Sequence, residues 1–296
     1  MSNINNARGV YYDRKLISKI INKLFYMVKY LYDESFFKYE GYNYSIVFKL
    51  STTNGDYFAN NPTTVACCCW YCEQIIIGIN PKLLSSYRNT ITQYGDYGKF
   101  VWSETYKAIE RKIEPILAHE ITHAQLCKYN INSEVEVLEN VDETDICYEN
   151  KFNDKTVTDF EKSVVYWFCP QERQARLSEG YVKLKNKLRK SINLYGNDFA
   201  KFIKADEIYS CLYEETSNNK LENLYQKLIS SPTEDLTYLL THKSAVFSPR
   251  TNNLHLEHKR IIRRLASIRE YNKKKLIKVA GKIKEELNEK NKGKRF

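Results

Sequence analysis

Glycine and proline are scarce in this chain of 296 residues, which contains 10 and 6 of them. Because these residues mark turns and flexible linkers, their scarcity predicts a helix-rich protein with few long linkers. No apolar run approaches the roughly 20 residues that a membrane-spanning helix needs. No charged-then-apolar N-terminal pattern indicates a secretory signal either, so we expect no membrane partner.

The chain has eight cysteines, but it lacks the even cysteine spacing of a secreted disulfide framework. Four of them crowd into Cys67, Cys68, Cys69 and Cys72, and the others are isolated. We therefore expect reduced thiols and a cytoplasmic location, in a cell or an infected host, or in a virion if a phage encodes the chain. Cys69 and Cys72 lie in a strand-like segment without a second such pair, which favours buried structural cysteines over a second zinc site.

Histidine is also rare, with five in the chain, yet two of them stand close together. Residues 115–126 read Pro-Ile-Leu-Ala-His-Glu-Ile-Thr-His-Ala-Gln-Leu and contain His119-Glu120-x-x-His123. On a helix, positions i and i+4 share one face, so both imidazoles can bind one metal ion. Glu120 then lies beside the metal as general base, and zinc suits these ligands. The alternative is a pair of histidines satisfied by their neighbours, with Glu120 in solvent.

A catalytic zinc site needs a third protein ligand, and no histidine follows His123 until His242. Glu172 is the preferred candidate, because it opens a helix that Pro170 begins, where the helix dipole favours a carboxylate. Ala175 lies one turn further on and is small enough to permit a close approach to the metal helix. Other carboxylates remain candidates for the same role: Glu139, Asp142, Glu143 and Glu161.

The two motifs together resemble those of known metallopeptidases. A His-Glu-x-x-His sequence followed some fifty residues later by Glu-x-x-Ala is similar to the gluzincin type, and the second motif resembles that of small bacterial and phage proteins of this kind. The resemblance covers roughly residues 65–184. It implies a zincin-like fold, a zinc ion held by His119, His123 and Glu172, and Glu120 as the catalytic residue. One position departs from the pattern: Arg176 stands where gluzincins often carry an acidic residue that orients a ligand histidine.

Periodic patterns predict an α+β fold. We expect residues 1–195 to contain a small antiparallel or mixed sheet and the His-Glu-x-x-His helix, which the resemblance implies is a zincin-like catalytic domain. We expect residues 196–296 to form an all-α C-terminal region that ends in a basic amphipathic helix. We expect strands at 42–50, 63–69 and 74–79. We expect a helical stretch from residue 104 that Pro115 interrupts, and helices at 13–32, 82–94, 115–129, 171–192, 198–215, 220–229, 235–242 and 256–290, with an acidic connection at 130–150.

The net charge of +10 is unevenly placed. Residues 259–296 contain 15 Lys or Arg and 4 Glu, a net of +11, which leaves a net of −1 for the rest of the chain. A basic helix of this kind can contact nucleic-acid phosphates or a protein partner. An apolar stripe at helical period runs through it, however: Ile261, Leu265, Ile268, Leu276, Val279, Ile283 and Leu287. The stripe favours a helix docked on the body or on another chain, with the basic face in solvent.

We therefore expect a zinc metallopeptidase that cleaves a protein or peptide, with a tyrosine such as Tyr166 stabilising the oxyanion. One alternative is a DNA-associated protease of the SprT-like kind guided by the basic tail. Such proteins use a third histidine, and many add a zinc ribbon; neither is present here. A further alternative is a non-catalytic virion or assembly protein on a zincin scaffold, which would need no metal.

Overall fold

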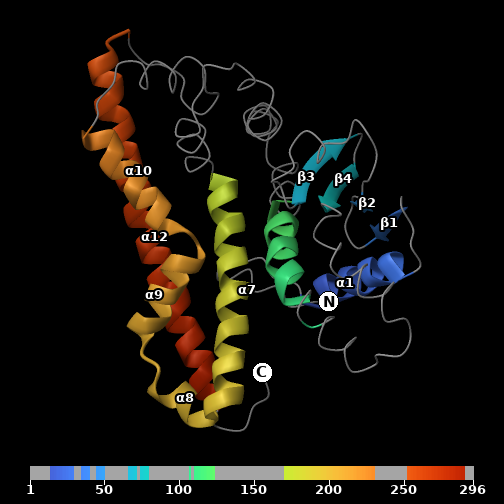
Figure 1. The fold of residues 1–296 in the computed structure, drawn as a ribbon. Helices are drawn as coiled ribbons and strands as arrows, with labels where there is room; N and C mark the ends of the chain where they lie inside the picture. The colour runs from blue at the N-terminus through green and yellow to red at the C-terminus, as the bar shows by residue number, and fades with distance from the viewer. Residues whose placement is uncertain are drawn as a thin grey trace. The chain divides into compact units, whose positions relative to one another are not determined.

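A computed structural model describes nine parts of the chain (Figure 1). They are residues 14–29, 35–40, 45–50, 66–71, 74–79, 107, 110–123, 170–230 and 252–290. The chain divides into two compact units, Met1–Lys128 and Tyr129–Phe296. The predicted helices 82–94 and 235–242 and the acidic connection 130–150 lie outside the described residues.

The first unit begins with a helix, α1, at Arg14–Lys29, as the spacing of its apolar residues predicts. Leu16, Ile17, Ile20 and Ile21 are fully buried, so one face of α1 packs into the core of this unit. The unit ends with the helix of residues 110–123, whose inward side includes Ile113, Leu117, Ala118 and Ile121. Both helices therefore show the apolar stripe that tertiary packing requires.

Four six-residue strands form one mixed sheet in the order β1-β2-β4-β3. These are β1 at Ser35–Glu40, β2 at Ser45–Leu50, β3 at Ala66–Tyr71 and β4 at Gln74–Ile79. β3 and β4 form an antiparallel hairpin, in which Tyr71 pairs with Gln74. β2 is antiparallel to β1 and parallel to β4. The strand β1 was not predicted.

The predicted α+β fold class is wrong for the part of the chain that the structure describes in full. Nearly all residues with a described side-chain environment are helical, and Ala66 is the one strand residue among them. The described core is accordingly built from helix faces.

Proline does not begin the metal-motif helix, contrary to our expectation for residues 115–129. Residues 110–114 are already helical, and Pro115 lies within the helix and is buried. Proline cannot donate a backbone hydrogen bond there, so the packing of this apolar helix outweighs the preference of proline for a first turn.

The second unit consists of five described helices (Figure 1). They are α7 at Pro170–Tyr195, α8 at Asn197–Phe202, α9 at Ala205–Glu215, α10 at Asn218–Ser230 and α12 at Leu254–Lys290. α12 packs along α8, α9 and α10, and α7 packs against α8 and α9. The predicted helices 171–192, 220–229 and 256–290 are confirmed to within three residues at each end.

The predicted helix 198–215 is instead two helices. Ile203 ends α8 in an extended conformation, with ψ at 128°, and Lys204 is also extended. Glu207 accepts a hydrogen bond from the backbone N–H of Lys204 at 3.3 Å, which caps the start of α9. The apolar pattern runs through this break, so the local cap, and not the pattern, determines where α9 begins.

The apolar stripe of α12 is buried, as the docked interpretation predicts. Its members Ile261, Leu265, Leu276, Val279, Ile283 and Leu287 are all at most 4% exposed. Basic side chains of the same helix remain on the exposed side, among them Lys259, Arg263, Arg264, Lys273, Lys274 and Lys278. α12 is thus docked within its own unit, and a nucleic-acid or protein partner for its basic side stays a prediction.

The domain boundary after residue 195 also stays a prediction. Contacts divide the chain after Lys128, and α7 packs with the helices that follow it. Compact packing does not by itself say which segments fold or act together. Among the described helices, none is both long enough and apolar enough to cross a membrane.

Two helix glycines offer a matched test of this packing. A Cβ on Gly180 of α7 would lie 2.4 Å from Cγ2 and 3.1 Å from the backbone nitrogen of Thr216, whereas a Cβ on Gly281 of α12 meets nothing within 4 Å. Gly180→Ala should therefore lower the free energy of unfolding by about 1–3 kcal/mol. Gly281→Ala should raise it by about 0.5–1 kcal/mol, because alanine loses less backbone entropy in a helix.

Urea unfolding of the two variants and the wild type, followed by circular dichroism, measures both changes. Equal effects of the two substitutions would contradict the close approach of α7 to Thr216.

Candidate metal centre

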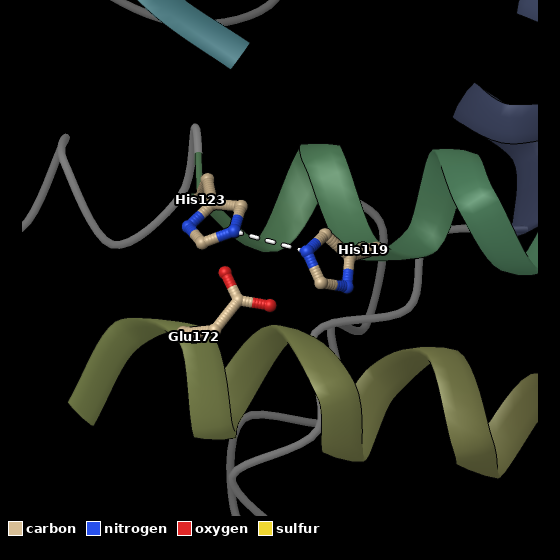
Figure 2. Close-up of side chains that lie close together, drawn as sticks. All are labelled: His119, His123 and Glu172. Atoms are coloured by element: carbon tan, nitrogen blue, oxygen red, sulfur yellow. Dashed lines mark hydrogen bonds between the residues drawn. The ribbon is translucent and has the colours of Figure 1, made fainter. Parts of the chain in front are cut away.

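His119 and His123 lie one turn apart on the helix of residues 110–123 and converge through the same ring nitrogen. Their Nε2 atoms are 3.2 Å apart, and the ring centroids are separated by 4.9 Å with the planes at 65° (Figure 2). This is the i, i+4 arrangement that the sequence predicts for two ligands of one metal ion.

The separation of the two nitrogens fits zinc. Two nitrogen ligands of a tetrahedral zinc ion, with bonds of about 2.0–2.1 Å, lie about 3.3 Å from each other. The observed 3.2 Å between the Nε2 atoms agrees with that spacing. The pair is therefore arranged as one zinc ion requires, with only small adjustments of the rings.

The surroundings of the motif are apolar, and Glu120 is buried. Glu120 is 7% exposed and His123 is 6% exposed, so the alternative that places Glu120 in solvent does not hold. Thr122 is fully buried, and its hydroxyl donates to the Ala118 carbonyl at 2.7 Å, which satisfies its polar group within the helix. Burial strengthens any electrostatic interaction that the histidines and Glu120 make.

Glu172 lies in the first turn of α7 and is 5% exposed, and Ala175 is completely buried one turn further on. One ligand atom from each of His119, His123 and Glu172 lies within 4.8 Å of the others, so this group could hold a metal ion (Figure 2). Two imidazoles and one carboxylate form a ligand set that zinc accepts in catalytic sites, with one position left for water.

Arg176 is a residue whose role the motif did not reveal. Its Nε lies 3.3 Å from Oε1 of Glu172, and its Nη1 lies 3.4 Å from Oε2 of Glu179. The signal for these contacts was present in the sequence as i, i+4 and i, i+3 spacing of opposite charges. The other carboxylates considered as third ligands, and Tyr166, lie outside the described residues.

No comparison with known proteins assigns this chain to a family. The chain matches no model of a protein family. It is also similar to no curated protein and to no solved structure at the level at which a relationship is accepted. The resemblance to gluzincins therefore depends on the residues of the two motifs.

The turn of α7 that carries Glu172 also contacts a lysine of α12. Lys275 donates a hydrogen bond to the side-chain oxygen of Gln174. Burial, together with the nearby charge of Arg173, lowers the pKa of Lys275 to about 8. A lysine with a lowered pKa holds its proton less readily in the folded protein than in the unfolded chain.

The low pKa of Lys275 predicts a pH-dependent stability. Below about pH 8 the lysine is charged in both states, and the cost of burying that charge is present in full. Between pH 8 and 10.5 the unfolded chain binds more protons, so the free energy of unfolding should rise with pH. Relative to Lys275→Met, the wild type should gain on the order of 1–2 kcal/mol between pH 7 and 10, allowing for partial exposure.

Urea unfolding of both proteins at several pH values checks this gain. A difference between them that stays constant with pH would contradict the lowered pKa.

Proposed function

We propose that this chain is a zinc-dependent metallopeptidase in which His119, His123 and Glu172 hold the metal and Glu120 is the general base. The observation that carries the proposal is the 3.2 Å separation of the two Nε2 atoms, which is the spacing of two ligands on one zinc ion. The position of Glu172 within 4.8 Å of the histidine nitrogens supports it as the third ligand.

The chemistry follows from the residues around this group. A zinc ion held by His119, His123 and Glu172 would lower the pKa of a water molecule toward neutrality and polarise the carbonyl of the scissile peptide. Glu120 accepts the proton of the attacking water and passes it to the leaving amine nitrogen. Its burial keeps bulk water away from this transfer. We place the activity in the cytoplasm, because the cysteine spacing favours reduced thiols.

Zinc content tests the ligand set. Elemental mass spectrometry should find about one zinc per purified wild-type chain and a clear loss in Glu172→Ala, because two histidines alone hold zinc weakly. Glu214→Ala is the matched control, since Glu214 is an exposed glutamate of the same unit and should leave the zinc content unchanged. Circular dichroism shows whether each variant remains folded.

The other results are equally informative. Zinc retained by Glu172→Ala would move the third ligand to another carboxylate, such as Glu161 or one in residues 130–150. No zinc in the wild type, even after reconstitution, would refute the proposal in favour of a non-catalytic protein on this scaffold.

The substitution Glu120→Gln tests the role of Glu120 in hydrolysis separately from the binding of zinc. The amide cannot accept the proton, so hydrolysis of a quenched fluorescent peptide library should fall about 10²- to 10⁴-fold while the zinc content stays at the wild-type level. Full hydrolysis by a zinc-loaded Glu120→Gln protein would show that another group is the base.

A further inference from the structure

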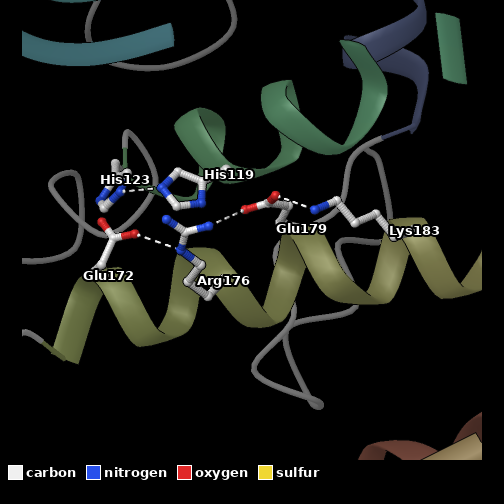
Figure 3. A network of polar contacts seen from close by, with 6 residues as sticks. All are labelled: His119, His123, Glu172, Arg176, Glu179 and Lys183. Carbon is white, nitrogen blue, oxygen red and sulfur yellow. Dashed lines mark hydrogen bonds and ion pairs between the residues drawn. The ribbon is translucent and has the colours of Figure 1, made fainter. Parts of the chain in front are cut away.

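Four charged side chains of alternating sign follow one another along α7 (Figure 3). Arg176 forms ion pairs with Glu172 at 3.3 Å and with Glu179 at 3.4 Å, and Lys183 pairs with Glu179 at 2.7 Å. The spacings are i, i+4, then i, i+3, then i, i+4, which keep all four on one side of the helix. Arg176 is thus shared between two carboxylates.

Burial distinguishes this row from an ordinary surface ion pair. The side chains of Glu172 and Glu179 are 7% and 12% exposed, and those of Arg176 and Lys183 are 32% and 38% exposed. In α8, by contrast, the pair of Lys201 and Asp198 is 59% and 71% exposed, where such a pair contributes little. Buried carboxylates require a compensating charge, and along this face of α7 Arg176 supplies it.

The planar shape of the guanidinium group explains why an arginine suits position 176. A guanidinium presents five N–H donors in a rigid plane, so it can meet two carboxylates at once through different nitrogens. Here Nη1 donates a hydrogen bond to Oε2 of Glu179 at 3.4 Å, and Nε forms an ion pair with Oε1 of Glu172 at 3.3 Å that lies outside hydrogen-bond geometry. The single ammonium of a lysine is a point charge on a flexible chain and would favour one of the two.

We infer that Arg176 is a positioning residue of the zinc centre: it holds Oε1 of Glu172 so that the carboxylate binds the metal through Oε2 alone. This inference rests on the proposed function. A carboxylate that bound through both oxygens would occupy the position that a catalytic zinc keeps for water. Arg176 therefore has a reason to stand where gluzincins often carry an acidic residue.

Glu179 completes the arrangement by cancelling the charge of Arg176. A lone guanidinium next to a metal ligand would repel the incoming zinc ion, because two positive charges a few ångströms apart are costly in a buried site. The 3.4 Å pair with Glu179 offsets that charge and also anchors the guanidinium. Lys183 in turn compensates Glu179 at the more exposed end of the row.

Zinc affinity measured against a chromophoric chelator tests the inference. Arg176→Met should bind zinc about 10- to 100-fold more weakly, the usual effect of removing a group that holds a ligand. Arg176→Lys should restore part of the loss. Glu179→Gln should also weaken binding, and its effect should not add to that of Arg176→Met, since both act through the guanidinium.

Lys187→Met is the matched control. Lys187 is a further cation of α7, and it pairs with Glu215 of α9 rather than with the row at the metal centre. Glu215 raises the pKa of Lys187 through their hydrogen bond, so this pair is also a formed interaction. Its removal should leave the zinc affinity unchanged.

Cobalt substitution gives a second readout that a merely structural role would not move. If Arg176 limits Glu172 to one oxygen, the Arg176→Met protein should bind Co²⁺ with a higher coordination number. Its visible absorption should then be weaker than that of the wild type, because the intensity of these bands falls as coordination rises from four to five. Arg176→Lys should return the spectrum toward that of the wild type.

The possible results separate this inference from the proposed function. If the wild type binds zinc and Arg176→Met binds it equally or more tightly with the same cobalt spectrum, the inference is overturned and the metal centre stands. If the wild type binds no zinc, both the inference about Arg176 and the proposed function are overturned. A loss of affinity that matches an equal loss of folded protein by circular dichroism, in Arg176→Lys and Glu179→Gln as well, would assign a structural role and also overturn the inference.

Discussion

Charge that is removed from water has to be compensated where it is buried, and the second unit depends on this constraint. Along α7, Arg176 meets both Glu172 and Glu179. The same solution recurs in α12, where Glu257 is 1% exposed and accepts a hydrogen bond from Arg260 at 2.8 Å, one turn further on. Each buried carboxylate has its cation on the same helix, so the compensation forms as soon as the helix does.

Because α12 is docked through its apolar stripe, much of the excess positive charge of the chain lies on the exposed side of this helix. The apolar stripe of the helix is used within its own unit, against α8, α9 and α10. An apolar face that is already buried cannot insert into a lipid surface or pair with another helix unless α12 detaches. The exposed side of α12 carries many of its basic side chains, and a partner for them stays a prediction.

The bounds of a helix were predicted well where its apolar residues recur with a clear helical period. They were predicted poorly where a local backbone feature, such as a helix cap, interrupts the helix. α7, α10 and α12 begin and end within three residues of their predicted bounds. The break between α8 and α9 was missed, because the apolar pattern continues through Ile203 and the cap at Lys204 is a matter of backbone conformation. β1 was missed because Phe36 and Phe37 are adjacent and do not alternate with polar residues. The fold class was wrong for the residues whose side-chain environment is described, because nearly all of them lie in helices.

The sequence by itself determined the spacing of His119 and His123, since the geometry of one helix turn brings residues i and i+4 together without help from the rest of the chain. It also indicated Glu172 as a candidate, but it left other carboxylates open. Only the tertiary structure buried Glu120 and Glu172. Burial and side-chain orientation depend on packing between segments distant in sequence, and no local pattern encodes that packing.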